Sequence, residues 1–548
     1  MLISLVAGLC YAFTIYRSLD SKLKRAIEAH CSELFPSLSI RIRSAQVIIG
    51  EGLQIRGLRV LDPHGDRHSG LLLDVDELFL AGPVDYQQLL AKRLQIKRVV
   101  IRRPHLHLVN RQQDGWNIAR LFPLPRGSGQ CVPLEIENGL IEIVDMRKSP
   151  ASGLTLRDVQ LSLTPPGPTT EDSAPLWNLR GTMTGDFLRR IDIEGSIDPG
   201  SLRTRLAGRV DSIEFGPEFQ SALPLEITRR LESLQHLRAQ LALTFQLYIE
   251  VQSPPQITFD VAGQIVRGRI DDPRLPHPIS DIRGTFACRN SGIEVRNLSA
   301  TMGQTALNVS SFTLFGWTLS DPFDLEARCE HLEFDPAIAQ LLPTVLQEEW
   351  PKYFPQGLVD LSIQFNSRRE GSQFRVVADL QNVSFAYYKF PYRLQQTFGR
   401  MELTPERLTI QLVARANGQP VEIRGQVLTP LTSPRSQIFL SGKEITLDDR
   451  LVDAILNPKT RKTIRSLQLS GTADFWLSLW QDKPGEELHR HLEATLNRCS
   501  IKYQGFPYPI SNITGRLIMR DEAWSFEELK GVQGSAQITA DGTLLSDA

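Results

Sequence analysis

Short runs of alternating apolar and polar residues fill the chain after Pro36 and constrain its fold more than any other feature. Ile40 and Ile42 begin the pattern, and Leu53 and Ile55 continue it. Successive side chains of a strand lie on opposite faces, so such runs, bounded by Gly, Pro, Asn or Asp, predict half-buried strands. We therefore expect a mainly β body along almost all of the 548 residues.

Few segments break this alternation, and each is short. Three of them follow predicted strands at Leu206–Phe215, Leu325–Phe334 and Ile438–Leu447, so we expect a strand to lead into a helix three times. The expected helices are Asp85–Arg93, about Leu223–Arg238, about Pro336–Glu349 and Asp448–Ile455.

An internal repeat of about 30 residues occurs three times without gaps, beginning at Leu275, Phe390 and Phe506. Such self-similarity is the sequence signature of a repetitive architecture. The strand that follows the last shared glycine slips, because Val421 and Ile423 sit one position away from their counterparts. The shared positions are Pro276, Pro391 and Pro507, then Gly284, Gly399 and Gly515, and finally Gly303, Gly418 and Gly534.

Two shapes satisfy a long series of strands with one apolar face each. The sheet can curl into an open trough with an apolar inside, or each repeat can close its own two-sheet core. The alternation alone fits both, and it leaves open which face of a strand points inward, because a slip of one residue reverses it.

Residues 1–16 carry no charge, and Arg17 ends this run. Sixteen helical residues reach about 24 Å, slightly less than the roughly 30 Å of a bilayer core. Three interpretations follow: a signal anchor that lacks its upstream part, a cleaved signal peptide, or a buried helix. We favour the anchor, because no basic n-region and no clear cleavage site precede Arg17. Residues 17–36 continue as a polar amphipathic segment, which we expect to be a membrane-proximal helix.

Composition excludes several classes of protein. The formal net charge is -1, whereas nucleic-acid binding needs a basic excess, so we expect no nucleic-acid partner. The six cysteines form no CxxC or zinc-ribbon spacing. No phosphate-binding GxxxxGK[ST] or GxGxxG loop occurs between a strand and a helix, and no GxSxG is present. We therefore expect no enzyme, no catalytic residue and no cofactor.

Two pairs of histidines have a spacing that could begin a metal site. His105 and His107 share a strand face, but no third ligand is evident, so we expect exposed strand histidines and no metal. His489 and His491 receive the same interpretation.

A Leu-rich segment that begins at Leu89 is followed by an alternating run through Pro104 and then by Asp114-Gly115 and Asn117. In this pattern residues 40–124 resemble the N-terminal region of the AsmA-like family. That family has a short Leu-rich helix, a strand of the type "I..l.i..P.l.l", a "dG..N" turn and a final "l..l" pattern. The repeats also resemble the long members of the AsmA/TamB group, which are akin to bridge-like lipid-transfer proteins. The matching residues here are Leu89, Leu90, Leu94, Ile96, Val99, Pro104, Leu106, Leu108, Asp114, Gly115, Trp116, Asn117 and Leu121.

The resemblance implies an elongated, repetitive antiparallel β-groove, taco-like in section, with short helices and an N-terminal transmembrane helix. It also implies a single-pass protein of the bacterial inner membrane with its body in the periplasm. The expected regions are a transmembrane signal anchor at 1–16, a membrane-proximal helix at 17–36, an AsmA-like β region at 37–199, and groove repeats at 200–315, 316–430 and 431–548. A fourth repeat could begin where the sequence ends, so a truncated third repeat is one of the expectations.

The expected function is to bind phospholipid in the groove and convey it toward the outer membrane. The expected partners are phospholipid, the inner membrane, and outer-membrane or other envelope proteins. The alternative is a structural or assembly factor for outer-membrane biogenesis that acts through protein contacts. Alternation and repeat register select the candidate groove-lining residues: Leu71, Leu73, Leu106, Leu108, Phe286, Ile293, Val295, Met401, Leu403, Leu408, Ile410, Leu517, Met519, Trp524 and Phe526.

Overall fold

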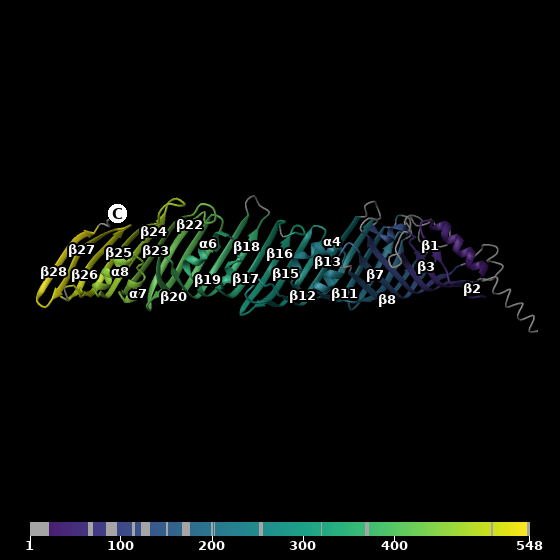
Figure 1. Ribbon diagram of the computed structural model, residues 1–548, viewed down its shortest axis with the longest axis horizontal. Helices are drawn as coiled ribbons and strands as arrows, with labels where there is room; N and C mark the ends of the chain where they lie inside the picture. The colour runs from purple at the N-terminus through teal and green to yellow at the C-terminus, as the bar shows by residue number, and fades with distance from the viewer. Residues whose placement is uncertain are drawn as a thin grey trace, which may run out of the picture. The chain divides into compact units, whose positions relative to one another are not determined.

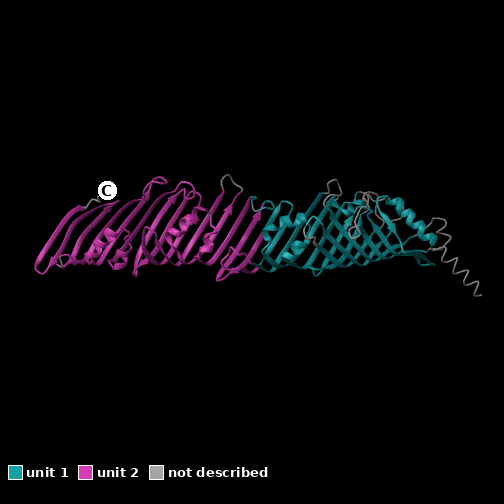
Figure 2. Cartoon of the chain, viewed as in Figure 1, with its two compact units in different colours: residues 1–270, 283–294, 315–321 teal, residues 271–282, 295–314, 322–548 magenta. Residues whose placement is uncertain are grey.

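The structure, a computed structural model, is mainly β (Figure 1). The chain divides into two compact units, which Figure 2 distinguishes by colour. Unit 1 comprises residues 1–270, 283–294 and 315–321, and unit 2 comprises residues 271–282, 295–314 and 322–548. The residues described are 21–63, 70–83, 96–111, 115–121, 132–148, 152–166, 176–198, 201, 203–250, 256–318, 320–342, 344–367, 372–505 and 508–544.

In the described residues, twenty-eight strands form one sheet. The first thirteen lie in unit 1: β1 Ser39–Arg41, β2 Ser44–Ile48, β3 Gly52–Leu61, β4 Leu71–Ala81, β5 Arg98–Arg111, β6 Gly115–Trp116, β7 Leu134–Asp145, β8 Ser152–Thr164, β9 Trp177–Gly185, β10 Ile191–Ile197, β11 Thr204–Phe215, β12 Leu237–Glu250 and β13 Gln256–Ile270. The units share β14 Ile279–Arg289 and β15 Gly292–Met302.

The remaining strands lie in unit 2: β16 Thr305–Leu314, β17 Phe323–Glu333, β18 Gln356–Asn366, β19 Gln373–Tyr387, β20 Phe390–Leu403, β21 Arg407–Ala416, β22 Gln419–Leu428, β23 Arg435–Thr446, β24 Ser470–Gln481, β25 His489–Ile501, β26 Ile510–Arg520, β27 Ala523–Gln533 and β28 Ala536–Leu544. Strands adjacent in the sequence pair antiparallel from β16 to β28 and from β7 to β13. The expectation of a mainly β, antiparallel fold is therefore confirmed.

One pairing departs from this pattern. Strand β5 is antiparallel to β4 on one side but parallel to β7 on the other. The two-residue strand β6 separates them in the sequence and pairs with the end of β5. A parallel neighbour needs a crossover connection, and the sequence pattern gave no sign of one here.

Bulges bend the strands of each unit. Residues with positive φ interrupt the pairing register near the middle of many strands, for example Asn382 in β19 and Gln396 in β20. An extra residue in one strand bends it and increases its local twist, which is how a sheet curls. Asn138 and Asp158 mark the same irregularity in unit 1. Among the described residues no pairing joins the outermost strands of a unit, so each unit holds an open, curled sheet.

A glycine of the repeat follows each bulge of this kind in β20 and β26. Gly399 and Gly515 have φ of 130° and 136°. A Cβ at Gly399 would lie 2.3 Å from the carbonyl oxygen of Gln411 on the next strand. The repeat therefore keeps glycine here because a side chain would strike the neighbouring backbone.

Helices follow every sixth strand from β11, as the sequence predicts. The expected range Leu223–Arg238 holds only a short helix, Leu225–Arg230, and a 3-10 turn, and another short helix, Pro217–Ala222, precedes it. The expected helix near Pro336–Glu349 is split into Pro336–Ala339 and Thr344–Tyr353, and the helix Pro458–Ser466 was not expected. The expected helix Asp85–Arg93 and the anchor at 1–16 lie outside the described residues. The helices after these strands are α3 Pro217–Ala222, α4 Leu225–Arg230 and η2 Glu232–Leu234 after β11, α5 Pro336–Ala339 and α6 Thr344–Tyr353 after β17, and α7 Asp449–Asp453 and α8 Pro458–Ser466 after β23. A 3-10 helix, η1 Asn117–Leu121, follows β6.

A further helix spans residues 21–34, inside the expected membrane-proximal segment. Its Leu23 and Ile27 pack against a buried cluster of β2 and β3 that includes Val47 and Ile55. The carboxylate of Glu28 accepts a hydrogen bond from the backbone N–H of Ile42 at 2.8 Å. The helix therefore covers apolar side chains at the first strands of unit 1.

Candidate functional site

The predicted lining residues of the second repeat lie on one face of the sheet in unit 2. Met401 and Leu403 on β20 lie directly opposite Ile410 and Leu408 on β21, respectively. Cross-strand partners point to the same side, so these four side chains form one apolar patch. All four are half-buried. Met401 and Ile410 also pack against the main buried cluster of unit 2.

The third repeat arranges its lining candidates in the same way. On β26 and β27, Leu517 lies opposite Phe526, and Met519 lies opposite Trp524. All four are again half-buried, and Leu517 packs against a cluster that contains Leu496. Two repeats that share a sequence pattern therefore place the same kind of paired apolar side chains on the sheet.

The candidates of the first repeat, Phe286, Ile293 and Val295, are half-buried as well. A Cβ at Gly263 would come within 2.7 Å of the Phe286 ring, so the ring lies over this glycine of β13. Cys288, two residues after Phe286, is half-buried, and burial is the main cause that raises the pKa of its thiol to about 11. This thiol stays neutral and adds to the apolar surface.

The four N-terminal candidates lie on β4 and β5 and are half-buried. Leu73 lies opposite Leu106, and both pack against a buried cluster centred on Leu72. Leu108 lies beside Ile143 of β7. Leu71 lies opposite Leu61 next to a register shift and is not part of that packed cluster.

Burial changes along the apolar face of β21. Leu408 and Ile410 are half-buried, whereas Leu412, Ala414 and Ala416, farther along the same face, are buried. Helix α7 lies against β20, and burial raises the pKa of Tyr392 on that strand. One part of the apolar face is therefore covered by the chain's own packing, and the other part remains partly open to a ligand.

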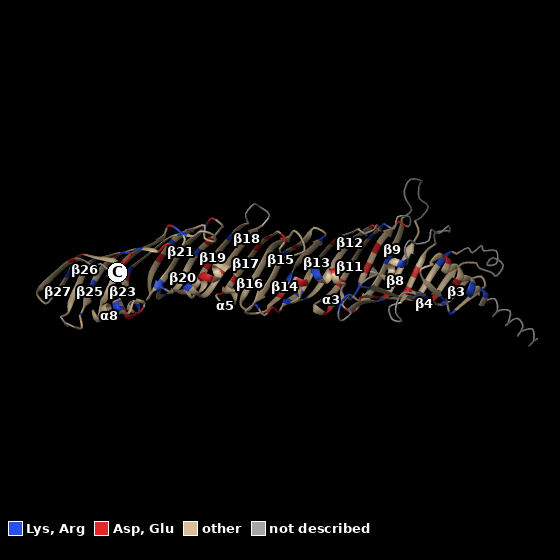
Figure 3. Cartoon of the chain, turned by 45° about the horizontal axis from the view of Figure 1, so that its top comes forward, with Lys and Arg blue, Asp and Glu red and all other residues tan. Residues whose placement is uncertain are grey.

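The opposite face of these strands is charged. Arg400 pairs with Asp379 at 2.7 Å, and Arg375 pairs with Glu402 at 2.7 Å. Because Arg400 and Glu402 alternate with Met401 and Leu403, one strand separates ion pairs from apolar side chains. Figure 3 shows acidic and basic residues interspersed along the strands.

The basic residues Arg98, Arg102 and Arg103 of β5 form a basic run, and each of them is also paired with a carboxylate. Arg102 lies 2.6 Å from a carboxylate oxygen of Glu77 and 3.0 Å from one of Glu137. The hydrogen bonds that Arg102 donates to these two carboxylates are the main cause that raises its pKa. The run forms part of an ion-pair ladder across three strands, which suits a solvent-facing sheet surface.

The "dG..N" turn of the resemblance has a structural role in the described residues. Asn117 is buried, its side-chain oxygen accepts from the Val109 N–H at 3.0 Å, and its amide donates to the His107 carbonyl at 2.8 Å. Gly115 takes a positive φ, and Trp116 pairs with Asn110. Asn117 thus satisfies backbone groups of β5. Asp114, Leu89, Leu90 and Leu94 lie outside the described residues.

A cavity of about 1270 Å³ opens in unit 1 between β8 and β14. Apolar residues such as Leu206, Leu247 and Phe259 border it together with charged residues such as Arg180 and Arg205. Sequence reasoning did not single out this region, because most of its lining, from Ser162 on β8 to Asp260 on β13, lies upstream of the three aligned repeat segments.

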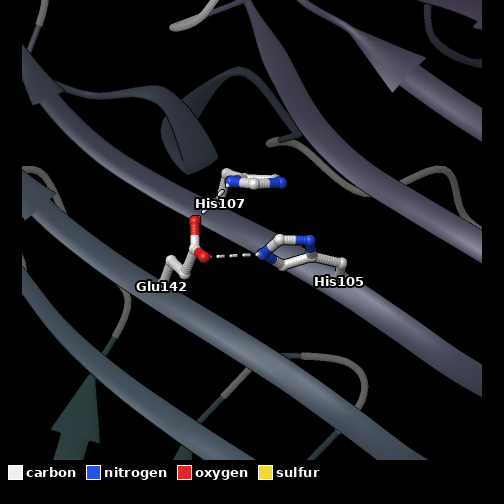
Figure 4. A group of neighbouring side chains, drawn as sticks. All are labelled: His105, His107 and Glu142. Atoms are coloured by element: carbon white, nitrogen blue, oxygen red, sulfur yellow. Dashed lines mark ion pairs between the residues drawn. The ribbon is translucent and has the colours of Figure 1, made fainter.

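His105 and His107 on β5 gather with Glu142 of β7, as Figure 4 shows. His105 Nε2 lies 3.2 Å from Glu142 Oε1, and His107 Nδ1 lies 3.0 Å from Glu142 Oε2. The expectation of exposed histidines without a third ligand is therefore wrong: both are half-buried and the third group is present. Burial is the main cause that lowers the pKa of His107, which favours a neutral ring near pH 7.

The second histidine pair does not gather a third group. His489 lies 3.3 Å from Asp521, and His491 lies 3.4 Å from Glu493. Throughout the described residues, His105, His107 and Glu142 form the one group of three potential metal ligands.

Two further findings bear on identity. No helix in the described part of the chain combines the length and the apolar composition needed to cross a bilayer. Comparisons with protein-family models, with curated proteins and with solved structures found no match to this chain.

Proposed function

We propose that this protein binds phospholipid by its acyl chains on the apolar face of the curled sheet and conveys it along that face. The observation that carries the proposal is the composition of the main buried cluster of unit 2. That cluster joins Met302 of the first repeat, Leu412 of the second and Ile445 of the third. Residues of three successive repeats therefore pack into one apolar cluster within this unit, and the third repeat holds a further cluster around Leu496.

The half-buried pairs supply the binding surface. Met401, Leu403, Leu408 and Ile410 are large apolar side chains that the protein covers only in part. Apolar surface that stays partly exposed favours an apolar ligand, at about 0.8 kcal/mol for each buried CH₂ group. An acyl chain would cover these side chains while its head group stays in water.

Movement along the face needs no bond to be broken. Neighbouring apolar patches of similar composition bind an acyl chain with similar free energy, so the chain can pass between them at little cost. Net direction then comes from a lipid gradient or from an energised partner.

The resemblance to the AsmA-like family supplies the cellular setting of the proposal. In it, residues 1–16 anchor the protein in a bacterial inner membrane, the body lies in the periplasm, and the lipid moves toward the outer membrane. Envelope proteins would receive the lipid at the far end of the sheet.

The decisive experiment measures phospholipid that copurifies with the full chain, using mass spectrometry, for the wild type and two variants. Ile410→Asp places a carboxylate on the apolar face, whereas Gln411→Asp places one at the next residue, on the charged face opposite Arg400. We expect bound lipid in the wild type and in Gln411→Asp, and a loss of severalfold or more in Ile410→Asp.

Circular dichroism first shows that both variants retain the wild-type strand content. The proposal is wrong if the folded wild type carries no phospholipid, or if folded Ile410→Asp carries as much as the control. In that case a structural or assembly role through protein contacts becomes the better explanation.

A further inference from the structure

The group formed by His105, His107 and Glu142 is held by two strands with a fixed register. His107 lies directly beside Glu142 in the parallel pair β5–β7, and His105 is two residues earlier on β5. Residues two apart on a strand share a face, so all three side chains lie on one side of the sheet. That side is the charged one, because Leu106, between the histidines, packs into the apolar cluster. The group is therefore separate from the proposed lipid-binding face.

The spacing of the three groups matches that of metal ligands. The contacts from the imidazole nitrogens to the Glu142 oxygens are 3.2 Å and 3.0 Å. With bonds of about 2.05 Å to a tetrahedral zinc ion, neighbouring ligand atoms lie roughly 3.3 Å apart. One ligand atom from each of the three residues lies within 4.8 Å of the other two, so a rearrangement of the side chains alone would place them around one cation.

Two nitrogen atoms of the group have no hydrogen-bond partner. The Nε2 atoms of His105 and His107 are both buried, and neither makes a hydrogen bond. His105 Nε2 faces Glu142 Oε1 at 3.2 Å without the alignment of a hydrogen bond. Buried polar atoms are nearly always partnered, so an unpartnered one is destabilising and indicates a missing partner. A bound cation would satisfy at least one of these nitrogens.

The environment favours a cation over an anion. Glu142 brings one negative charge, and the two rings ligate metals in their neutral form. Asp74 lies opposite His105 on β4 and pairs with Arg59 at 3.2 Å, so the strand on the other side adds no unpaired positive charge. Glu142 is 37% exposed, which leaves room for a water molecule as a fourth ligand.

We propose that His105, His107 and Glu142 bind a divalent transition-metal ion, with Zn²⁺ as the best fit. Two imidazoles and one carboxylate are donors that zinc accepts readily, whereas Ca²⁺ and Mg²⁺ prefer oxygen ligands alone. The ion would bridge β5 and β7. It would thus stabilise the parallel pairing of β5 and β7, which no short hairpin connects.

The test uses the full chain without a histidine tag, stripped with a chelator and titrated with Zn²⁺ by calorimetry. We expect one Zn²⁺ per chain in the wild type. Glu142→Gln keeps an acceptor for the His107 N–H but removes the carboxylate, and His107→Asn removes one ring. Each should weaken Zn²⁺ binding by at least about tenfold, since even residues that only orient a ligand contribute that much.

The matched control is the double variant His489→Asn and His491→Asn, which removes the other strand-borne pair and should bind Zn²⁺ as the wild type does. A second readout needs no variant: Co²⁺ bound to the wild type should give the intense visible absorption of a tetrahedral site. Absence of that absorption, or equal Zn²⁺ affinity in the wild type and in Glu142→Gln, would overturn the proposal.

Discussion

The carboxylate of Asp145, at the end of β7, accepts a hydrogen bond from the backbone N–H of Leu225, the first residue of α4, at 3.0 Å. Arg147 binds the same carboxylate at 2.6 Å and also pairs with Glu226. The helical segment after β11 is therefore tied to a strand 80 residues earlier. Because Phe219 of α3 packs into the apolar cluster of unit 1, this tie holds a cover over part of the apolar face.

Replacing Asp145 with alanine should weaken the attachment of α3 and α4 to the apolar face of unit 1. Asp145 is 2% exposed, and its loss leaves Arg147 with Glu226 and solvent as partners. We expect the free energy of local opening of α3 and α4 to fall by about 2 kcal/mol, below the value for a fully buried ion pair. Hydrogen–deuterium exchange of residues 217–230 measures this. Asp192→Ala removes an exposed partner of Arg190 and should change the same amides by less than about 0.5 kcal/mol. Equal effects would contradict the assignment.

The same carboxylate predicts a dependence on pH. The hydrogen bond from Arg147 is the main cause that holds the pKa of Asp145 well below its ordinary value of 3.8. A carboxyl group with a depressed folded-state pKa stabilises the fold fully above its unfolded-state pKa and loses that contribution as the pH falls. Protection of the α4 amides, corrected for intrinsic exchange, should therefore drop from about pH 5 downward. Asp145→Asn should remove this pH dependence, and an unchanged profile would refute the mechanism.

Adjacent residues on β21 test the register of the sheet. Leu412 is 7% exposed within the main cluster of unit 2, whereas Val413 is 48% exposed on the other face. Leu412→Asp buries a charge and should lower the urea midpoint strongly, by an amount equivalent to about 3 kcal/mol or more. Val413→Asp should cost less than about 1 kcal/mol, the range of strand propensities. The opposite order would show that the register is wrong by one residue.

This register explains how far the repeat could be predicted. The gapless alignment matches Val413 with Leu298 and Leu529, yet Val413 faces the other way. Asn297 and Glu528 have positive φ, whereas β21 runs to β22 without a register shift. A bulge adds one residue and reverses the alternation beyond it, so the missing bulge in β21 reverses the match.

The shared glycines record the same shift. Gly303 and Gly534 are the first residues of their two-residue turns, whereas Gly418 is the second, after Asn417. Both turn positions accept Asn or Gly with positive φ. The glycines therefore align in the three sequences, although the turn of the second repeat begins one residue earlier relative to its glycine. The slip at Val421 and Ile423 was visible in the sequence, but its cause was not.

The metal-ligand group shows another limit. Two histidines at spacing two were evident, but Glu142 lies 35 residues from His107 and reaches it through a parallel pairing. Alternation predicts which residues share a face of one strand and says nothing about which strand comes next. The third ligand could therefore be found only in three dimensions.

Cys288 should react slowly with alkylating reagents. Burial, followed by the charge of Asp260, raises its pKa from 9.0 to about 11. Because the thiolate is the reactive form, its population at pH 8 falls by about a hundredfold. In a variant that keeps only this cysteine, we expect iodoacetamide to modify it about a hundred times more slowly than in the urea-unfolded chain, with a rate that rises up to about pH 11. Equal rates would show that Cys288 is not on a covered apolar face.

Trp524 and Trp476 together test where a lipid binds within unit 2. Trp524 is half-buried on the apolar face opposite Met519, whereas Trp476 is 40% exposed on the charged face and stacks on Phe439. Phospholipid with brominated acyl chains quenches tryptophan fluorescence only on close approach. Variants that retain one of these two tryptophans, with the other tryptophans replaced by phenylalanine, report on each face separately.

We expect brominated phospholipid to quench Trp524 substantially and Trp476 by little more than the same lipid without bromine does. The reason is that an acyl chain gains free energy only against apolar side chains, and Trp476 lies opposite Glu493, whose carboxylate stays hydrated. Adding Ile410→Asp to the Trp524 variant tests whether repeats act together, since Ile410 lies in the preceding repeat. Loss of quenching at Trp524 would show that lipid binding in the third repeat depends on the apolar face of the second, whereas unchanged quenching would show that the third repeat binds lipid independently. Equal quenching of the two tryptophans would mean that lipid associates with both faces without preference, and the proposed binding face would then be wrong.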